Sequence, residues 1–124
     1  MLIEEATRRS GVVWVTPEGA DRAQPVWHLW HEGAMYVVTG GIEQPLPAGD
    51  TATVTVRSNA AQADRVVTWM AEVSRVEPGS PLWDEVVPLL HAKRLNAPDG
   101  EEQPARWARE SLVLRFHPTG ETVS

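Results

Sequence analysis

The sequence contains no cysteine, which excludes disulfide frameworks, thiolate metal sites and cysteine nucleophiles. Lysine occurs only once, at Lys93, and the formal net charge is -6 with acidic and basic residues interspersed. Such a chain attracts neither a phosphate backbone nor an anionic membrane, so we expect no binding to nucleic acid or membranes. No hydrophobic run approaches membrane-spanning length, and acidic residues stand where a signal peptide would be apolar. We therefore expect a soluble, cytoplasmic protein.

Phenylalanine and tyrosine are equally scarce, with one residue each, whereas tryptophan occurs six times. The length of 124 residues and the hydrophobic content of 42% predict a single domain, residues 1–124, with its own core. Six indoles need a core, an interface or a ligand to contact. For any one tryptophan, packing is the simpler explanation, and Trp69 and Trp83 lie on apolar faces of a predicted strand and helix.

Alternating apolar and polar residues, or β-branched and aromatic residues bounded by turn residues, predict strands at residues 12–16, 24–31, 34–39, 51–58, 65–76 and 110–117. Helices are predicted at residues 2–9, from Pro81 after an N-capping Ser80, and over one or two turns at residues 104–109. Pro88 lacks the amide hydrogen that a helix interior needs, so the main helix should kink or restart there. Glu32 and Gly33 predict a tight hairpin turn. The missing helices between successive strands exclude a βαβ fold and favour a small antiparallel barrel.

Three short segments carry a resemblance to a known family: residues 25–30 (PVWHLW), residues 35–40 (MYVVTG), and the closing-strand residues Ser111, Val113, Arg115 and Pro118. They resemble the pyridoxamine 5′-phosphate oxidase-like superfamily, or FMN-binding split barrels, and especially its actinobacterial flavin/deazaflavin oxidoreductase branch. The resemblance implies a mainly β fold, a six-stranded antiparallel split β-barrel with one main helix and short flanking helices. It also implies a homodimer that binds FMN or coenzyme F420 in grooves between its subunits and acts as a two-electron oxidoreductase of a small unsaturated substrate.

The resemblance also assigns residues to the cofactor phosphate. Thr39 and Gly40 match a hydroxyl and a glycine that lie near it, and Gly41 stands where many relatives have arginine. The loop at residues 42–47 reads IEQPLP where the family normally offers lysine or arginine. Backbone amides of the two glycines could bind the anion instead.

A replacement cation for the phosphate is offered first by Arg57, on the polar face of the next strand, and second by Arg65. In the loop itself, Glu43 would repel a phosphate, which is usually held by charge-assisted hydrogen bonds.

The cofactor ring system is expected to be bordered by Trp27, His28 and Trp30. Because successive side chains of a strand point to opposite faces, Trp27 and Trp30 should face opposite ways. His28 and His31 should do so too, so we expect no metal site shared between them. His28 is either a hydrogen-bonded interior histidine or a pocket residue that donates to a flavin. His31, beside the hairpin turn, is most simply a solvated surface residue.

Trp107 and Arg109, close to the closing strand, are second-rank candidates for the partner subunit's groove. No serine lies in a nucleophile-elbow pattern, and no acid/base pair stands out, so the catalytic residues remain unidentified. A flavin oxidoreductase often needs none, because the cofactor supplies the chemistry. Two alternatives stay open: a cofactor-free split-barrel homodimer acting as a ligand-binding or interaction module, and a purely structural dimer.

Overall fold

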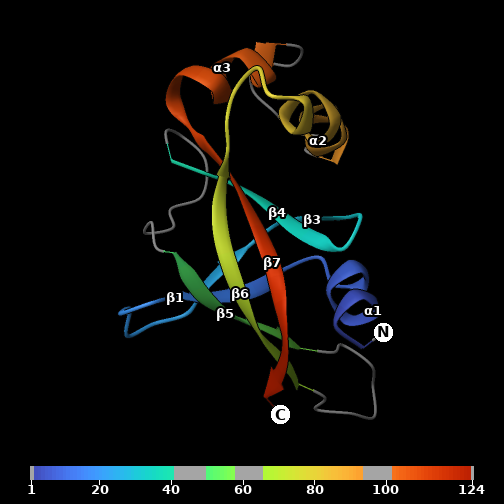
Figure 1. The fold of residues 1–124 in the computed structure, drawn as a ribbon, viewed down its shortest axis with the longest axis vertical. Helices are drawn as coiled ribbons and strands as arrows, with labels where there is room; N and C mark the ends of the chain where they lie inside the picture. Colours follow the sequence, from blue (N-terminus) through green and yellow to red (C-terminus); the bar gives the residue numbers. More distant parts are fainter. Residues whose placement is uncertain (1, 41–49, 58–65, 94–101, 124) are drawn as a thin grey trace.

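The computed structural model describes residues 2–40, 50–57, 66–93 and 102–123 (Figure 1). The helices there are α1 (Leu2–Arg9), α2 (Pro81–Lys93) and α3 (Gln103–Glu110). The strands are β1 (Val13–Pro17), β2 (Gln24–Val26), β3 (Leu29–His31), β4 (Ala34–Thr39), β5 (Thr51–Arg57), β6 (Val66–Val76) and β7 (Leu112–Val123). The mainly β architecture with one main helix, α2, and short helices α1 and α3 is therefore as predicted.

The seven strands form one antiparallel sheet in the order β2-β1-β5-β6-β7-β4-β3. The two long strands β6 and β7 run side by side through the middle of the molecule, and α2 and α3 lie near one end of this pair (Figure 1). β7 pairs with β6 on one side and with β4 on the other. In the described backbone, β7 is thus the strand that joins the β2-β1-β5-β6 group to the β4-β3 hairpin.

The prediction of one continuous strand at residues 24–31 is wrong, because the structure divides this segment into β2 and β3. β2 pairs with β1, whereas β3 pairs with β4. These partners lie at opposite ends of the sheet order, so the chain leaves one edge after β2 and reaches the other edge with β3. Trp27 and His28 form the two-residue link between them. The division gives seven strands instead of the predicted six.

Two further elements differ from prediction. β7 extends to Val123 rather than ending near His117, because it pairs with almost the whole length of β6. Pro118 is tolerated beside a shift in the pairing register, where a missing amide hydrogen costs little. The main helix α2 does not restart at Pro88 but continues through it to Lys93.

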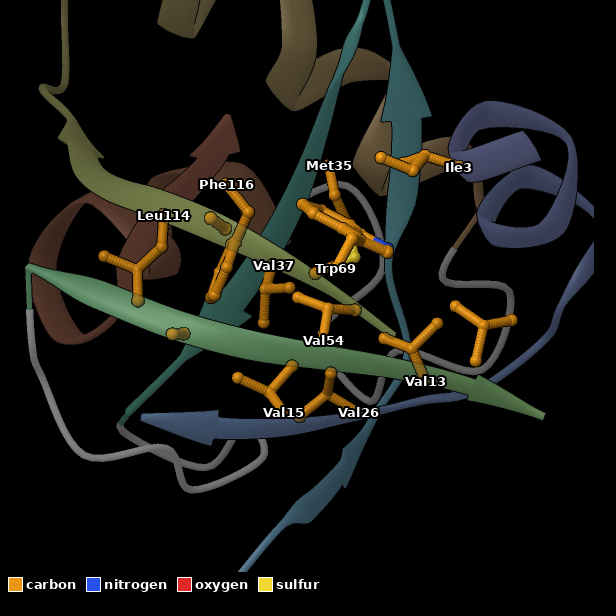
Figure 2. Packing of buried hydrophobic residues seen from close by; sticks show 13 residues of the cluster. Ile3, Val13, Val15, Val26, Met35, Val37, Val54, Trp69, Leu114 and Phe116 are labelled. Carbon is orange, nitrogen blue, oxygen red and sulfur yellow. The ribbon is translucent and has the colours of Figure 1, made fainter. Parts of the chain in front are cut away.

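The inner face of the sheet encloses the larger core, the barrel cluster (Figure 2). Its members are Ile3, Val13, Val15, Val26, Met35, Val37, Ala52, Val54, Val56, Trp69, Ala71, Leu114 and Phe116. Side chains from both groups of strands point toward one another, with Trp69 near the middle of the view (Figure 2). The alternation predicted for Val54 and Val56 is therefore confirmed.

A second core, the helix-side cluster, lies between the outer face of the sheet and helices α2 and α3. Its members are Ala34, Tyr36, Val38, Val76, Trp83, Val86, Val87, Leu90, Trp107 and Val113. β4 contributes alternate residues to both clusters, which is why its first five residues are buried; the sixth, Thr39, is buried as well. In the described part of the chain, no helix is long and apolar enough to cross a membrane.

Candidate functional site

The end of β4 meets the start of β7 at the residues predicted to lie near a cofactor phosphate. Thr39 is buried and pairs with Leu112, and Gly40 follows with a φ of 86°. The hydroxyl of Ser111 donates a hydrogen bond of 3.0 Å to the carbonyl of Gly40. Glycine adopts this left-handed conformation without strain, so the backbone at the end of β4 favours glycine at this position.

Trp27 packs toward the helices rather than into the barrel. Its ring lies 6.3 Å from that of Trp107 on α3, with a tilt of 37° between the planes. Trp107 is fully buried, whereas Trp27 is only half-buried. One turn after Trp107, the same helix ends beside Gly40, where a Cβ on Gly40 would lie 3.7 Å from the carbonyl oxygen of Glu110. Short helix α3 thus connects the predicted ring-binding and phosphate-binding residues.

Trp30 lies on the other side of the two-residue link. It packs against the barrel cluster, and its ring meets Trp69 edge-on at 6.1 Å. The prediction that Trp27 and Trp30 face opposite ways is confirmed. The structure therefore does not bring these two tryptophans together around one ligand ring.

His28 is completely buried, and its Nε2–H donates a hydrogen bond of 2.6 Å to the carbonyl of Thr7. Burial lowers the pKa of His28 from 6.5 to about 4; the Thr7 carbonyl opposes this shift, and the charge of Lys93 adds to it. A neutral, hydrogen-bonded side chain inside the protein matches the interior alternative of the two that the sequence left open.

Thr7 and Lys93 hold the link from two helices, and sequence reasoning missed both. Thr7 is buried on α1, where its hydroxyl accepts a 3.1 Å hydrogen bond from Trp69 Nε1. Lys93 Nζ, at the end of α2, donates to the carbonyl of His28. The sequence does indicate that Thr7 faces the interior, because it lies four residues after Ile3 and so on the same face of the helix. No neighbouring residue indicates the contact of Lys93.

Several predicted residues lie wholly or partly outside the described part of the chain. Gly41, Arg65 and the loop at residues 42–47 are among the residues that are not described. Arg57 ends β5 opposite Val66, and its side chain is not described either. Arg109 is exposed in the last turn of α3. The cation that would meet a phosphate stays a prediction.

A groove of about 460 Å³ lies on the outer face of the sheet, and none of its lining residues is a predicted site residue. Its walls come from β5, β6 and β7 and the residue before β5: Asp50, Thr51, Glu72, Val73, Ser74, Arg115 and His117. Two cationic or protonatable side chains thus face two carboxylates. Arg115 approaches His117 Nδ1 at 3.4 Å, so the two share one side of the groove.

His31 is more ordered than the predicted solvated surface residue, since its side chain is only 23% exposed. Its Nε2–H donates a hydrogen bond of 2.7 Å to Glu85 on α2, and its ring lies 6.4 Å from that of Tyr36. This hydrogen bond lowers the pKa of the Glu85 carboxyl. Glu32 of the hairpin turn lies 3.6 Å from the same nitrogen. The turn itself is as predicted, with positive φ at Glu32 and Gly33.

Solved structures of this shape come from several bacteria. HutZ, the heme storage protein from Vibrio cholerae, is 15% identical, and the match covers 98% of this chain and 91% of that one with a TM-score of 0.67. A protein from Listeria innocua, provisionally assigned as a pyridoxamine 5′-phosphate oxidase, is 13% identical over 98% and 94% with a TM-score of 0.65. An F420 reductase is 16% identical over 97% and 94% with a TM-score of 0.61.

No protein-family model and no curated protein sequence matches the chain. At 13 to 16% identity, the structural likeness establishes architecture alone. That likeness nevertheless extends over almost the whole chain. The chain has the split-barrel fold of the pyridoxamine 5′-phosphate oxidase-like proteins.

Proposed function

We propose that this chain binds a flavin-type cofactor, FMN or coenzyme F420, between two copies of itself and serves in the two-electron reduction of a small unsaturated substrate. The observation that carries the proposal is the arrangement around α3. A half-buried indole, Trp27, packs on Trp107, and the same helix ends beside the glycine turn at Gly40. An aromatic surface and a turn suited to an anion thus belong to one small region. The fold shared with an F420 reductase supports this choice of ligand class.

The described residues fit the ring end of such a cofactor better than its phosphate end. The exposed part of Trp27 offers a flat apolar surface for a ring, backed by the buried Trp107. At the other end, Gly40 has the positive φ that one residue of an anion-binding nest requires. β4 itself supplies no cationic side chain. We propose that Arg57 supplies the positive charge that meets the phosphate.

The cofactor, when bound, supplies the hydride or electron-pair chemistry. The role of this chain is then to hold and orient the ring, to exclude water from one of its faces, and to fix the phosphate end. Trp27 would provide the ring contact, while Thr39 and Gly40 would shape the phosphate end. His28 is buried beside this region and supports the link that carries Trp27.

Titration with FMN and with F420 tests the proposal. We expect saturable binding at micromolar concentration to the purified protein, followed by the absorbance and fluorescence of the cofactor itself. Trp27→Leu should weaken binding by about tenfold or more, because stacking on an aromatic side chain contributes roughly 1 to 3 kcal/mol. Trp30→Leu is the matched variant, since it removes a second half-buried indole on the barrel side of the link. Circular dichroism should show that both variants are folded.

Equal weakening by the two variants would show that the ring does not lie against Trp27. Absence of saturable binding of either cofactor up to millimolar concentration would exclude the flavin proposal altogether. The groove on the outer face favours the second candidate function in that case, a cofactor-free ligand-binding module. Its mixture of Arg115, His117, Asp50 and Glu72 suits a small zwitterion, and it involves none of the predicted flavin contacts.

The partner in either case is proposed to be a second copy, bound through the outer face of β1, β5 and β6. Five neighbouring side chains on this face are uncharged: Trp14, Thr53, Thr55, Thr68 and Met70. The hydroxyl of Thr53 is already bonded to the sulfur of Met70, which leaves few polar groups to desolvate. Depletion of charge is typical of the core of a protein interface.

Replacement of Trp14 by glutamate tests this face, because it places a charge on β1, where the indole is 36% exposed. We expect the wild-type protein to sediment with twice the mass of the chain and Trp14→Glu to sediment as a monomer. Leu89→Glu is the control, since Leu89 is similarly exposed but lies on α2. A monomeric wild-type protein, or a dimeric Trp14→Glu variant, would rule out this interface.

A further inference from the structure

Three potential metal ligands converge where the β3–β4 hairpin approaches α2. They are Nε2 of His31, at the end of β3, and one carboxylate oxygen each from Glu32 and Glu85. All three atoms lie within 4.8 Å of one another; His31 Nε2 is 2.7 Å from Glu85 Oε2 and 3.6 Å from Glu32 Oε2. Two carboxylates thus approach one imidazole nitrogen, and one of them, Glu85, lies 54 residues from His31 in sequence.

Each of the three side chains extends from a well-fixed part of the backbone. His31 belongs to the ladder of β3 with β4, and its ring packs near that of Tyr36. Glu32 has a φ of 46° in the two-residue turn, so its direction is set by the hairpin. Glu85 stands on α2 between buried residues that anchor the helix, among them Val86. The site therefore needs only side-chain adjustment, not movement of the backbone.

The ligand chemistry fits a divalent transition-metal ion. Imidazole nitrogen and carboxylate oxygen both bind zinc at about 2.0 to 2.2 Å, so ligands of one ion lie roughly 3 to 4 Å apart. The observed separations from His31 Nε2 are close to this range. Two carboxylates side by side repel one another, and a dication between them would relieve this repulsion. Both are also partly exposed, which leaves room for water to complete the coordination.

We propose that His31, Glu32 and Glu85 form a binding site for a divalent transition-metal ion of the zinc type, which links the β3–β4 hairpin to helix α2. Coordination requires the lone pair of His31 Nε2. The proton that this nitrogen now donates to Glu85 therefore moves to Nδ1 or is released to solvent. The hairpin turn and Gly40 lie at opposite ends of β4, so this site is separate from the proposed cofactor contacts.

Titration of metal-free, tag-free protein with Zn²⁺ by calorimetry, and with Co²⁺ by visible absorption, tests the proposal. We expect one ion per chain, a micromolar or tighter dissociation constant for Zn²⁺, and a higher melting temperature with Zn²⁺ because the ion binds the folded state. His31→Ala and Glu85→Gln should each weaken binding by about tenfold or more. His117→Ala is the matched control, since it removes an exposed histidine from β7.

Glu32→Gln provides a second test that does not depend on folding, because this side chain is 74% exposed and contributes little to packing. It should weaken Zn²⁺ binding while leaving the melting temperature of the metal-free protein unchanged. The proposal is overturned if wild type binds Zn²⁺ no more tightly than His31→Ala does. It is equally overturned if His117→Ala loses as much affinity as the three site variants. Binding of FMN or F420 does not enter either result.

Discussion

Trp69→Ala is expected to lower the free energy of unfolding by about 3 to 5 kcal/mol, because a large buried side chain is cut back to a methyl group. Trp69 is completely buried in the barrel cluster, in the middle of the view in Figure 2. Truncation removes its apolar contacts and leaves a cavity that the surrounding strands can fill only in part. It also removes the edge-on contact with Trp30 and the hydrogen bond to Thr7. Strand β6 would then lose this connection to α1.

Urea denaturation followed by circular dichroism measures this loss, with two variants that separate its causes. Trp69→Phe keeps most of the apolar volume but leaves the buried Thr7 hydroxyl without its donor, so we expect a loss of about 1 to 3 kcal/mol. Leu89→Ala truncates an exposed side chain of α2 and should change stability by no more than about 0.5 kcal/mol. A loss for Trp69→Ala as small as that for Leu89→Ala would contradict the central position of this indole.

The second large effect is a loss of stability in mild acid caused by His28. Its pKa in the folded protein is about 4, against 6.5 for the ordinary side chain, because burial disfavours the charged imidazolium. Between these two values the unfolded chain binds more protons than the folded one, so stability falls as the pH falls. From about pH 7.5 to about pH 5, this single group is expected to cost roughly 2 kcal/mol.

Urea denaturation at both pH values, for wild type and for His28→Gln, isolates the contribution. Glutamine cannot titrate, so the variant should lose about 2 kcal/mol less than wild type over the same pH interval. The comparison of two slopes remains valid even if the variant is less stable at neutral pH. The backbone carbonyl that receives Lys93 is present in both proteins. Parallel pH profiles for the two proteins would show that His28 is not buried in its neutral form.

Local patterns predicted much of the fold correctly. β4, the Glu32–Gly33 turn and the inward face of β5 follow from alternation and from glycine chemistry, which act between neighbours in sequence. The break at Trp27 and His28 could not be predicted in this way. Neither residue is a glycine or a proline that would mark a turn, and the break arises because β2 and β3 have different partners at opposite sheet edges.

The same difference, between features set by neighbours in sequence and features set by distant partners, applies to the candidate site. The opposite directions of Trp27 and Trp30 could be predicted from alternation, although the structure divides the continuous strand on which that prediction rested. The contacts of His28 with α1 and of His31 with α2 could not, because their partners lie 21 and 54 residues away along the chain. Such contacts depend on how the helices pack on the sheet, which no local sequence pattern specifies.

The position of β7 has a consequence for the order in which the barrel forms. The hairpins β1–β2, β3–β4 and β5–β6 each pair strands that are close in sequence, whereas β7 joins β4 across most of the chain. Closing so long a loop is entropically costly, and few contacts offset that cost before the strand is in place. During synthesis, part of the apolar face of each group of strands therefore stays exposed until residues 112–123 leave the ribosome. Only then can β7 pair with both β4 and β6.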